Sequence, residues 1–253
     1  MEDWKKRLYE QYVTSGQAGA ATAEWDAYDL ARFPFYRSLI QAHVPTGPDL
    51  NMVDLACGHG TLVYCLKESG YRNVGGVDIS QEQVDLAHRF GLTTIECGAI
   101  EPYLDGTDQS YDVVFLLDIL EHLTRTDLFA VLDSVNRRLN PGGKVIITVP
   151  NGAGLFGMRI RYGDLTHENC YTANSMGQAL STTGFADVRT YEVRPIPHGL
   201  KSAVRSVLWR VLTLPHRLLL AAETGEVRHV LTQNMLVTAV KKAPLPVVHR
   251  KSG

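Results

Sequence analysis

The sequence lacks the features that mark several large classes of protein. Its four cysteines, at positions 57, 65, 97 and 170, form no Cys-x-x-Cys pair, so we expect neither a zinc finger nor a disulfide framework. It has no run of about 18 apolar residues, as a membrane-spanning helix needs, and no apolar segment typical of a secretion signal near residue 1. A near balance of 25 basic and 27 acidic residues gives no overall field that attracts nucleic acid. We therefore expect a cytoplasmic protein with reduced thiols and no nucleic-acid partner.

The sequence does contain enough apolar material for a large core. Of its 253 residues, 45% are hydrophobic and 21% are charged, which excludes a disordered chain. The segment 1–46 is rich in aromatic residues and predicts two or three short helices that form a lid. We expect the main domain at 47–242, with a helical insertion at 195–230, and a flexible tail at 243–253.

Short apolar strands alternate with helices through the main domain. Strands are predicted at 52–56, 74–78, 93–96, 111–117 and 144–149, and helices at 61–68, 81–90 and 127–139. The last hundred residues add a helix at 173–183, strands at 187–194 and 234–241, and a long helix at 199–223. This alternation predicts an α/β fold, with a doubly wound, mostly parallel sheet and helices on both faces.

A glycine loop follows the first strand and opens the next helix. Gly58 and Gly60 let the backbone approach a ligand closely at a helix N-terminus. A dinucleotide fingerprint needs a third glycine where Val63 stands, so we do not expect an NAD site. Asp54 lies inside the first strand, and Asp78 ends the second, where a carboxylate can accept two hydrogen bonds from a ribose diol.

Five segments of the chain resemble the class I S-adenosylmethionine-dependent methyltransferases. They are Val53-Asp-Leu-Ala-Cys-Gly-His-Gly60, Gly76-Val-Asp78-Ile-Ser80, Tyr111-Asp-Val-Val-Phe115, Leu120-Glu-His-Leu123 and Leu139-Asn-Pro-Gly-Gly143. The resemblance implies a Rossmann-like sheet of seven strands, six of them parallel, with the last strand antiparallel and beside the fifth. It also implies S-adenosyl-L-methionine as the cofactor.

The same resemblance assigns roles to individual residues. Gly58 and Gly60 would border the methionine part of the cofactor, and Asp78 would bind its ribose. Asp54 would organise the loop or meet the methionine ammonium. Further cofactor contacts are expected from residues that follow or end the next strands: Ile79, Ala99, Ile100 and Leu117. Ala99 stands where the family often has an acid that faces the adenine amine.

Acids and histidines gather after the fourth predicted strand. Asp118, Glu121 and His122 have the spacing of one helical face at the carboxyl end of the sheet, and His167 lies in a later loop. His122 or His167, with Glu121 beside it, is a candidate general base for a hydroxyl acceptor. Alternatively, all four hold a divalent metal, Mg²⁺, Mn²⁺ or Zn²⁺. The turn is similar to that of metal-dependent small-RNA 2′-O-methyltransferases and of ubiquinone-pathway O-methyltransferases, yet such residues also serve packing and capping.

Three interpretations of the acceptor remain open. Segments 163–167 and 232–234 look similar to bacterial methyltransferases of polysaccharide biosynthesis, which predicts O-methylation of a sugar, a glycan or a lipid-linked hydroxyl. A quinol or other small aromatic acceptor is the second interpretation. The third is a cofactor-binding interaction protein without turnover.

The insertion at 195–230 is basic and amphipathic. It contains five basic and two acidic residues, and its segment 199–223 has an apolar stripe at helical spacing. This pattern predicts contact with the inner face of a membrane or with a lipid-linked substrate. The alternative is an ordinary helix packed on its own sheet or on a second subunit, and the oligomeric state stays open.

Overall fold

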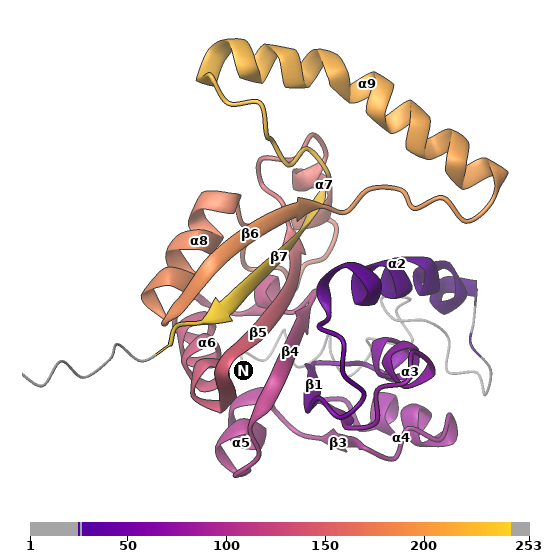
Figure 1. Ribbon diagram of the computed structural model, residues 1–253, viewed down its shortest axis with the longest axis vertical. Coiled ribbons are helices and arrows are strands. Elements are labelled where there is room, and N and C mark those ends of the chain that lie inside the picture. Colours follow the sequence, from indigo (N-terminus) through magenta and orange to yellow (C-terminus); the bar gives the residue numbers. More distant parts are fainter. Residues whose placement is uncertain (1–24, 26, 244–253) are drawn as a thin grey trace, which may run out of the picture.

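Seven strands form one sheet in the computed structural model, which describes residue 25 and residues 27–243 (Figure 1). They are β1 (Met52–Leu55), β2 (Val74–Asp78), β3 (Ile95–Cys97), β4 (Tyr111–Leu117), β5 (Leu139–Pro150), β6 (Phe185–Glu192) and β7 (Asn234–Lys241). Their order in the sheet is β3-β2-β1-β4-β5-β7-β6. β7 runs antiparallel to both its neighbours, and every other pair is parallel. The predicted α/β sheet, with its last strand antiparallel beside the fifth, is confirmed.

The chain winds outward in both directions from the β1–β4 pair. β1 pairs with β2 on one side and β4 on the other, so that Asp54 lies opposite Gly76 and Phe115. Such a reversal opens a crevice at the carboxyl ends of the strands, where open α/β sheets bind ligands. The fold therefore brings the glycine loop, Asp78 and Asp118 to one edge of the sheet.

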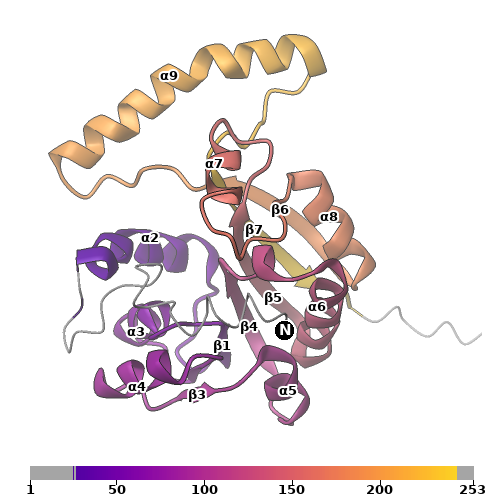
Figure 2. The same ribbon diagram turned by 180° about the vertical axis from the view of Figure 1, so that it is seen from behind.

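Helices cover both faces of the sheet (Figures 1 and 2). One layer contains α2 (Ala27–His43), α3 (Thr61–Glu68) and α4 (Gln81–Arg89), and the other contains α5 (Ile100–Asp105), α6 (Arg125–Arg138) and α8 (Ala173–Thr182). Side chains of β4 alternate between the two cores: Val114 and Leu116 join one, and Val113 and Phe115 join the other. Burial on both faces explains why this strand is a continuous apolar run.

Most predicted segments lie within two residues of the observed ones, and the differences have local causes. α6 begins at Arg125 because the Thr124 hydroxyl caps it by accepting a hydrogen bond from the Asp127 amide. β5 begins at Leu139 and not at residue 144, because Leu139 already pairs with Tyr111 of β4. The sequence pattern does not predict α5 or α7 (Gly157–Arg161), since such short segments carry little periodicity. The helical turn expected at 118–122 is the shorter 3₁₀ turn η1 (Leu120–His122).

Of the predicted lid at 1–46, the structure describes residue 25 and α2 onward. Asp29 of α2 is buried, and its Oδ1 lies 2.9 Å from His59 Nε2 and 3.0 Å from the Thr61 hydroxyl. Arg32 donates to the Asp118 carboxylate at 3.0 Å. These contacts fix α2 to the glycine loop and the sheet edge. The rest of the lid and residues 244–253 of the predicted tail lie outside the described residues.

The predicted insertion forms one long helix, α9 (Leu200–Thr224), between β6 and β7. It stands away from the sheet on extended linkers (Figures 1 and 2). The alternative of a helix that buries its apolar stripe on its own sheet is wrong, because most of those side chains are exposed. Among the described helices, none is long and apolar enough to cross a membrane.

Phe185 provides a test of the core on the α8 side of the sheet. Its side chain is fully buried at the start of β6, so Phe185→Ala should lower the free energy of unfolding by about 3–5 kcal/mol through lost contacts and a cavity. Phe129 on α6 is 41% exposed, and Phe129→Ala is a matched control with an expected loss below about 1 kcal/mol. Urea denaturation measures both, and equal losses would contradict this packing.

Candidate active site

The glycine loop presents its backbone to the carboxyl edge of the sheet. Gly58 and Gly60 have φ values of 55° and 85°, a region that side-chain-bearing residues rarely adopt. A Cβ at Gly60 would lie 2.4 Å from Ile95 Cδ1, so this glycine is needed for close packing. At Gly58 the nearest atom to such a Cβ is Gln83 Oε1 at 3.7 Å, which leaves the backbone accessible.

Asp78 is oriented by two backbone amides. Its Oδ2 accepts a hydrogen bond from Gly58 N at 2.7 Å, and its Oδ1 accepts one from Ser80 N at 2.9 Å. Burial raises the pKa of this carboxyl, and the two amides oppose that shift by stabilising the charged form. Each carboxylate oxygen can accept a further hydrogen bond, so the pair of oxygens suits a vicinal diol.

Asp54, Asp78 and Asp118 together make this edge negative. Asp54 is buried, and its pKa is raised well above its usual value by burial and then by the charges of Asp78 and Asp118. The Arg32 guanidinium acts in the opposite direction. Mutual repulsion among buried carboxylates favours a bound cation. A ligand that carries an ammonium and a sulfonium group would meet this need.

The other predicted cofactor residues lie along the same edge. Ile79 follows β2 and is 59% exposed, which leaves an apolar side chain free to cover a ring. Ala99 caps the start of α5 with its backbone, and Ile100 is the first residue of that helix. Leu117 ends β4 and is half-buried. The structure thus places these four residues at or just after the carboxyl ends of β2, β3 and β4.

His59 ties the glycine loop to its neighbours. Its Nδ1 lies 2.9 Å from Gln83 Oε1 of α4, and its Nε2 lies 2.9 Å from Asp29 Oδ1 of α2. The histidine therefore shapes the loop. Asp29 is a functional neighbour that sequence reasoning missed, because no local motif links it to a loop about thirty residues later.

A second group of side chains is built on η1, directly after β4. The Glu121 carbonyl accepts hydrogen bonds from the amides of Glu168 and Asn169, at 2.7 and 3.1 Å. The Tyr171 hydroxyl donates to the Leu120 carbonyl at 2.8 Å. The loop after α7 is therefore clamped onto η1, which brings His167 to the turn.

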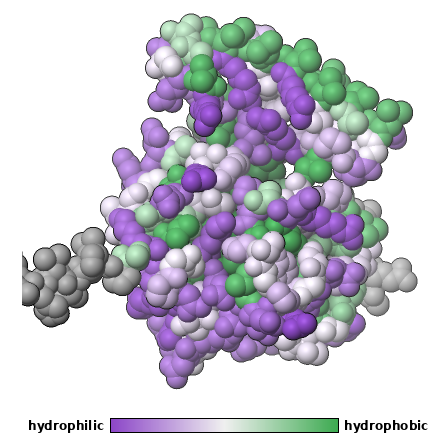
Figure 3. Space-filling model, viewed as in Figure 1, coloured by the Kyte–Doolittle hydropathy of each residue, from purple (hydrophilic) through white to green (hydrophobic). Residues whose placement is uncertain are grey.

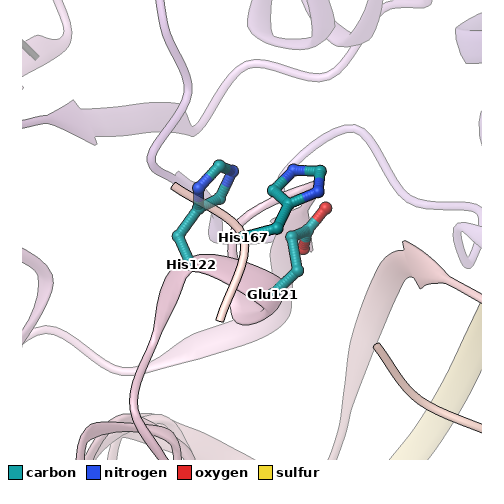
Figure 4. Close-up of side chains that lie close together, drawn as sticks. All are labelled: Glu121, His122 and His167. Carbon is teal, nitrogen blue, oxygen red and sulfur yellow. The ribbon is translucent and has the colours of Figure 1, made fainter. Parts of the chain in front are cut away.

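Glu121, His122 and His167 converge in this group (Figure 4). One ligand atom from each residue lies within 4.8 Å of the other two, and the two imidazole rings are 4.7 Å apart. Figure 4 shows the three side chains on the same side of the turn, with the Glu121 carboxylate beside His167. This spacing is compatible with one divalent cation bound by three residues.

Hydrogen bonds fix the tautomers of both histidines. The Thr166 hydroxyl donates to Asp164 at 2.6 Å, so it accepts from His122 Nδ1 at 2.8 Å. His167 Nδ1 donates to the Ile160 carbonyl at 3.0 Å. With Nδ1 carrying the proton, the lone pair of the neutral form of each ring lies on Nε2. Such outer contacts orient metal-binding histidines in many proteins.

Burial sets the ionisation of this group. It lowers the pKa of His122 to about 4, with a further contribution from His167, so this imidazole is neutral at pH 7. Glu121 is buried, and burial followed by the Asp118 charge raises its pKa well above the usual value. Its Oε2 has no hydrogen-bond partner among the residues that the structure describes. Burying a charged carboxylate oxygen without a hydrogen-bond partner costs free energy unless a proton or a cation binds to it.

Asp118 does not join this group, in contrast to the predicted four-residue set. Its φ of 55° turns the chain before η1 begins, so the expected helical face is interrupted. Its carboxylate accepts hydrogen bonds from Thr148 Oγ1 at 2.7 Å and from Arg32. Asp118 therefore belongs to the acidic edge beside Asp54. Thr166 and Asp164, which orient His122, were missed, although the Asp-x-Thr spacing is typical of a local turn.

The fold and this edge define a class I S-adenosylmethionine-dependent methyltransferase. A family model described as "Methyltransferase domain" matches residues 28–190, more than half of the chain, and the chain belongs to that family. The cofactor is S-adenosylmethionine, and the site fits it: paired oxygens on Asp78, an open Gly58 backbone and a negative edge.

Known proteins similar to this chain include an O-methyltransferase. Ubiquinone biosynthesis O-methyltransferase of Idiomarina loihiensis is 32% identical over 105 residues, which cover 40% of this chain and 42% of that protein. The chain spans less than half the length of the curated relatives it matches. A SAM-dependent methyltransferase of Archaeoglobus fulgidus has a TM-score of 0.61 at 20% identity, over 85% of this chain and 100% of that one. Phosphoethanolamine N-methyltransferase 2 of Haemonchus contortus, in complex with S-adenosylmethionine, has a TM-score of 0.62 at 17% identity, over 96% of this chain and 61% of that one.

Asp78 provides the most direct test of the cofactor site. Asp78→Ala removes two charge-assisted hydrogen bonds to the ribose, each worth about 1.5–3 kcal/mol, so the affinity for S-adenosylmethionine should fall at least about tenfold. Asp85 on the exposed side of α4 offers a matched control, because its side chain accepts a hydrogen bond from Gln81 of the same helix, and Asp85→Ala should leave affinity unchanged. Isothermal titration calorimetry measures both. Unchanged affinity in Asp78→Ala would contradict the assignment.

Proposed function

We propose that the protein transfers the methyl group of S-adenosylmethionine to a hydroxyl of a small aromatic acceptor of the quinol or phenol class. The observation that carries this proposal is the Glu121, His122 and His167 group at the end of β4, on the same edge as the cofactor residues. The similar protein of Idiomarina loihiensis is an O-methyltransferase of ubiquinone biosynthesis, which supports a hydroxyl acceptor on an aromatic ring. This acceptor replaces the sugar or glycan that the looser sequence resemblance favoured.

The chain would supply binding, orientation and proton removal. The cofactor supplies an electrophilic methyl group on a sulfonium. The acidic edge of Asp54, Asp78 and Asp118 stabilises the positive charge of the bound cofactor. The acceptor hydroxyl must lose its proton as the new bond forms. The group on η1 lies where that hydroxyl would be held.

We propose further that Glu121, His122 and His167 hold a divalent cation that positions the acceptor hydroxyl. The Nε2 atoms of the two imidazoles, whose Nδ1 atoms donate elsewhere, and a Glu121 oxygen that accepts no hydrogen bond among the described residues would provide three ligand atoms. This donor set suits Zn²⁺ or Mn²⁺ better than Mg²⁺. A cation there would lower the pKa of a bound hydroxyl, so no strong protein base is needed. Without a cation, His167 would be the base.

The acceptor class can be tested by turnover. Release of S-adenosylhomocysteine would be followed with catechols, hydroquinones and simple phenols, and in parallel with monosaccharides and their glycosides. We expect turnover with aromatic acceptors that places the new methyl group on oxygen, as shown by mass spectrometry. Turnover with sugars alone would contradict the proposal. Cofactor binding without turnover on any acceptor would favour an interaction protein.

The cation can be tested by its removal. After exhaustive treatment with a chelator, activity on the best aromatic acceptor should fall at least about tenfold, and Zn²⁺ or Mn²⁺ should restore it. Glu121→Gln should lower both the bound metal and the activity, without loss of cofactor affinity. Glu68→Gln on the exposed end of α3 is the matched control and should change neither. Full activity in the presence of chelator would contradict the metal site, and a histidine would then act as the general base without a metal.

A further inference from the structure

The long helix α9 exposes its apolar residues and buries its small polar ones. The buried residues of this helix are Ser202, Ser206 and Thr213. Nine of its large apolar side chains are exposed by 49–84%, whereas Trp209 and Leu220 are half-buried. Figure 3 shows these hydrophobic side chains along the outer edge of the helix, with hydrophilic ones beneath, toward the sheet. This arrangement is the reverse of an ordinary surface helix, which turns its apolar side to the core.

The exposed apolar residues form one continuous stripe. Leu200, Val204, Val207, Val211, Leu214 and Leu218 follow one another at intervals of three or four residues. The stripe runs from Leu200 to Leu218, about 27 Å along the helix at about 1.5 Å per residue. Water faces this stripe along its whole length in the described part of the chain, which is unfavourable unless a partner covers it.

Cations line both sides of the stripe. At about 100° per residue, Arg205 lies along one border of the exposed apolar sector and Arg210 along the other. Lys201 lies near the first border, among Leu208, Leu212 and Leu219. Glu223, in the last turn, is the single acid of α9. An apolar sector between two cationic borders is the pattern of helices that lie in the headgroup plane of a membrane.

The C-terminal half of α9 is fixed to the end of the sheet by Arg217. Arg217 pairs with Glu192 at the end of β6, and it also donates to the His229 carbonyl at 2.9 Å. The Leu231 amide donates to the same Glu192 carboxylate at 2.9 Å. The helix therefore presents its stripe in one direction, away from the sheet.

We propose that α9 docks the protein on an anionic lipid surface, with the apolar stripe at the boundary of the acyl chains and its cations at the phosphates. Charge favours lipid over a second copy of this chain. Two facing copies of α9 would bring their cations together with only Glu223 of each helix to offset them. Each cation near an anionic membrane is instead attracted to it. The proposal goes beyond the proposed function, because it concerns a surface away from the site.

Flotation with lipid vesicles tests this docking. The full chain should float with vesicles of phosphatidylcholine and about a third phosphatidylglycerol, and more weakly with phosphatidylcholine alone. Salt at about 1 M, where the screening length is about 3 Å, should reduce flotation on the anionic vesicles. Val211→Glu with Leu218→Glu should abolish flotation, because both charges enter the apolar stripe. Arg205→Glu with Arg210→Glu should lower the partition by more than about tenfold.

Matched variants elsewhere on the surface control for loss of apolar area and for net charge. Phe129→Glu places the same acid at an exposed apolar residue of α6, and Arg72→Glu with Arg137→Glu reverses two exposed cations. Both should float like the unaltered chain. Circular dichroism and cofactor affinity should match in all variants. Flotation that survives Val211→Glu with Leu218→Glu would overturn the proposal. A second outcome would also overturn it: the unaltered chain does not float, and light scattering shows a larger mass for it than for Val211→Glu with Leu218→Glu. In that case α9 would bind a second copy of the chain.

Discussion

Three carboxylates held at one edge of the sheet are the constraint on which the site depends. Burial raises the cost of the Asp54 and Asp78 charges, and the neighbouring charges of Asp78 and Asp118 add to that cost at Asp54. The fold offsets part of that cost with the amides of Gly58 and Ser80, with the Thr148 hydroxyl and with Arg32 of α2. The remaining negative charge suits a cationic cofactor. Cofactor recognition and the docking of α2 thus share one electrostatic origin.

The second half of the site depends on a loop that closes on a short turn. The carbonyl groups of η1 accept hydrogen bonds from this loop: Glu121 from the amides of Glu168 and Asn169, and Leu120 from the Tyr171 hydroxyl. These bonds bring the His167 ring to 4.7 Å from that of His122 and shield Glu121 from water. The Asp164–Thr166–His122 chain then directs an imidazole nitrogen toward the same point. A rigid scaffold thus positions groups from two segments more than forty residues apart.

Local patterns predict the sheet and its glycine loop well, because each depends on neighbouring residues. The strands β2 and β4 and the first residue of α4 are found at their predicted places. The positive φ of Asp118 is a tertiary effect: Thr148 and Arg32 hold its carboxylate, and no helical spacing reports such contacts. For the same reason the sequence predicted His122 and His167 together but not Thr166 or Asp29. The sequence predicts the apolar stripe of α9, but only the structure shows that this stripe faces solvent and not the sheet.

One edge of the sheet carries the cofactor residues on one side and the proposed cation residues on the other, and anomalous diffraction tests that division most directly. Crystals grown with S-adenosylhomocysteine and Mn²⁺ should place the ribose on the Asp78 carboxylate. A single Mn²⁺ peak should lie about 2.0–2.3 Å from Nε2 of His122, Nε2 of His167 and a carboxylate oxygen of Glu121. A ribose bound away from Asp78, or a well-ordered site with no anomalous peak among these three residues, would contradict the account.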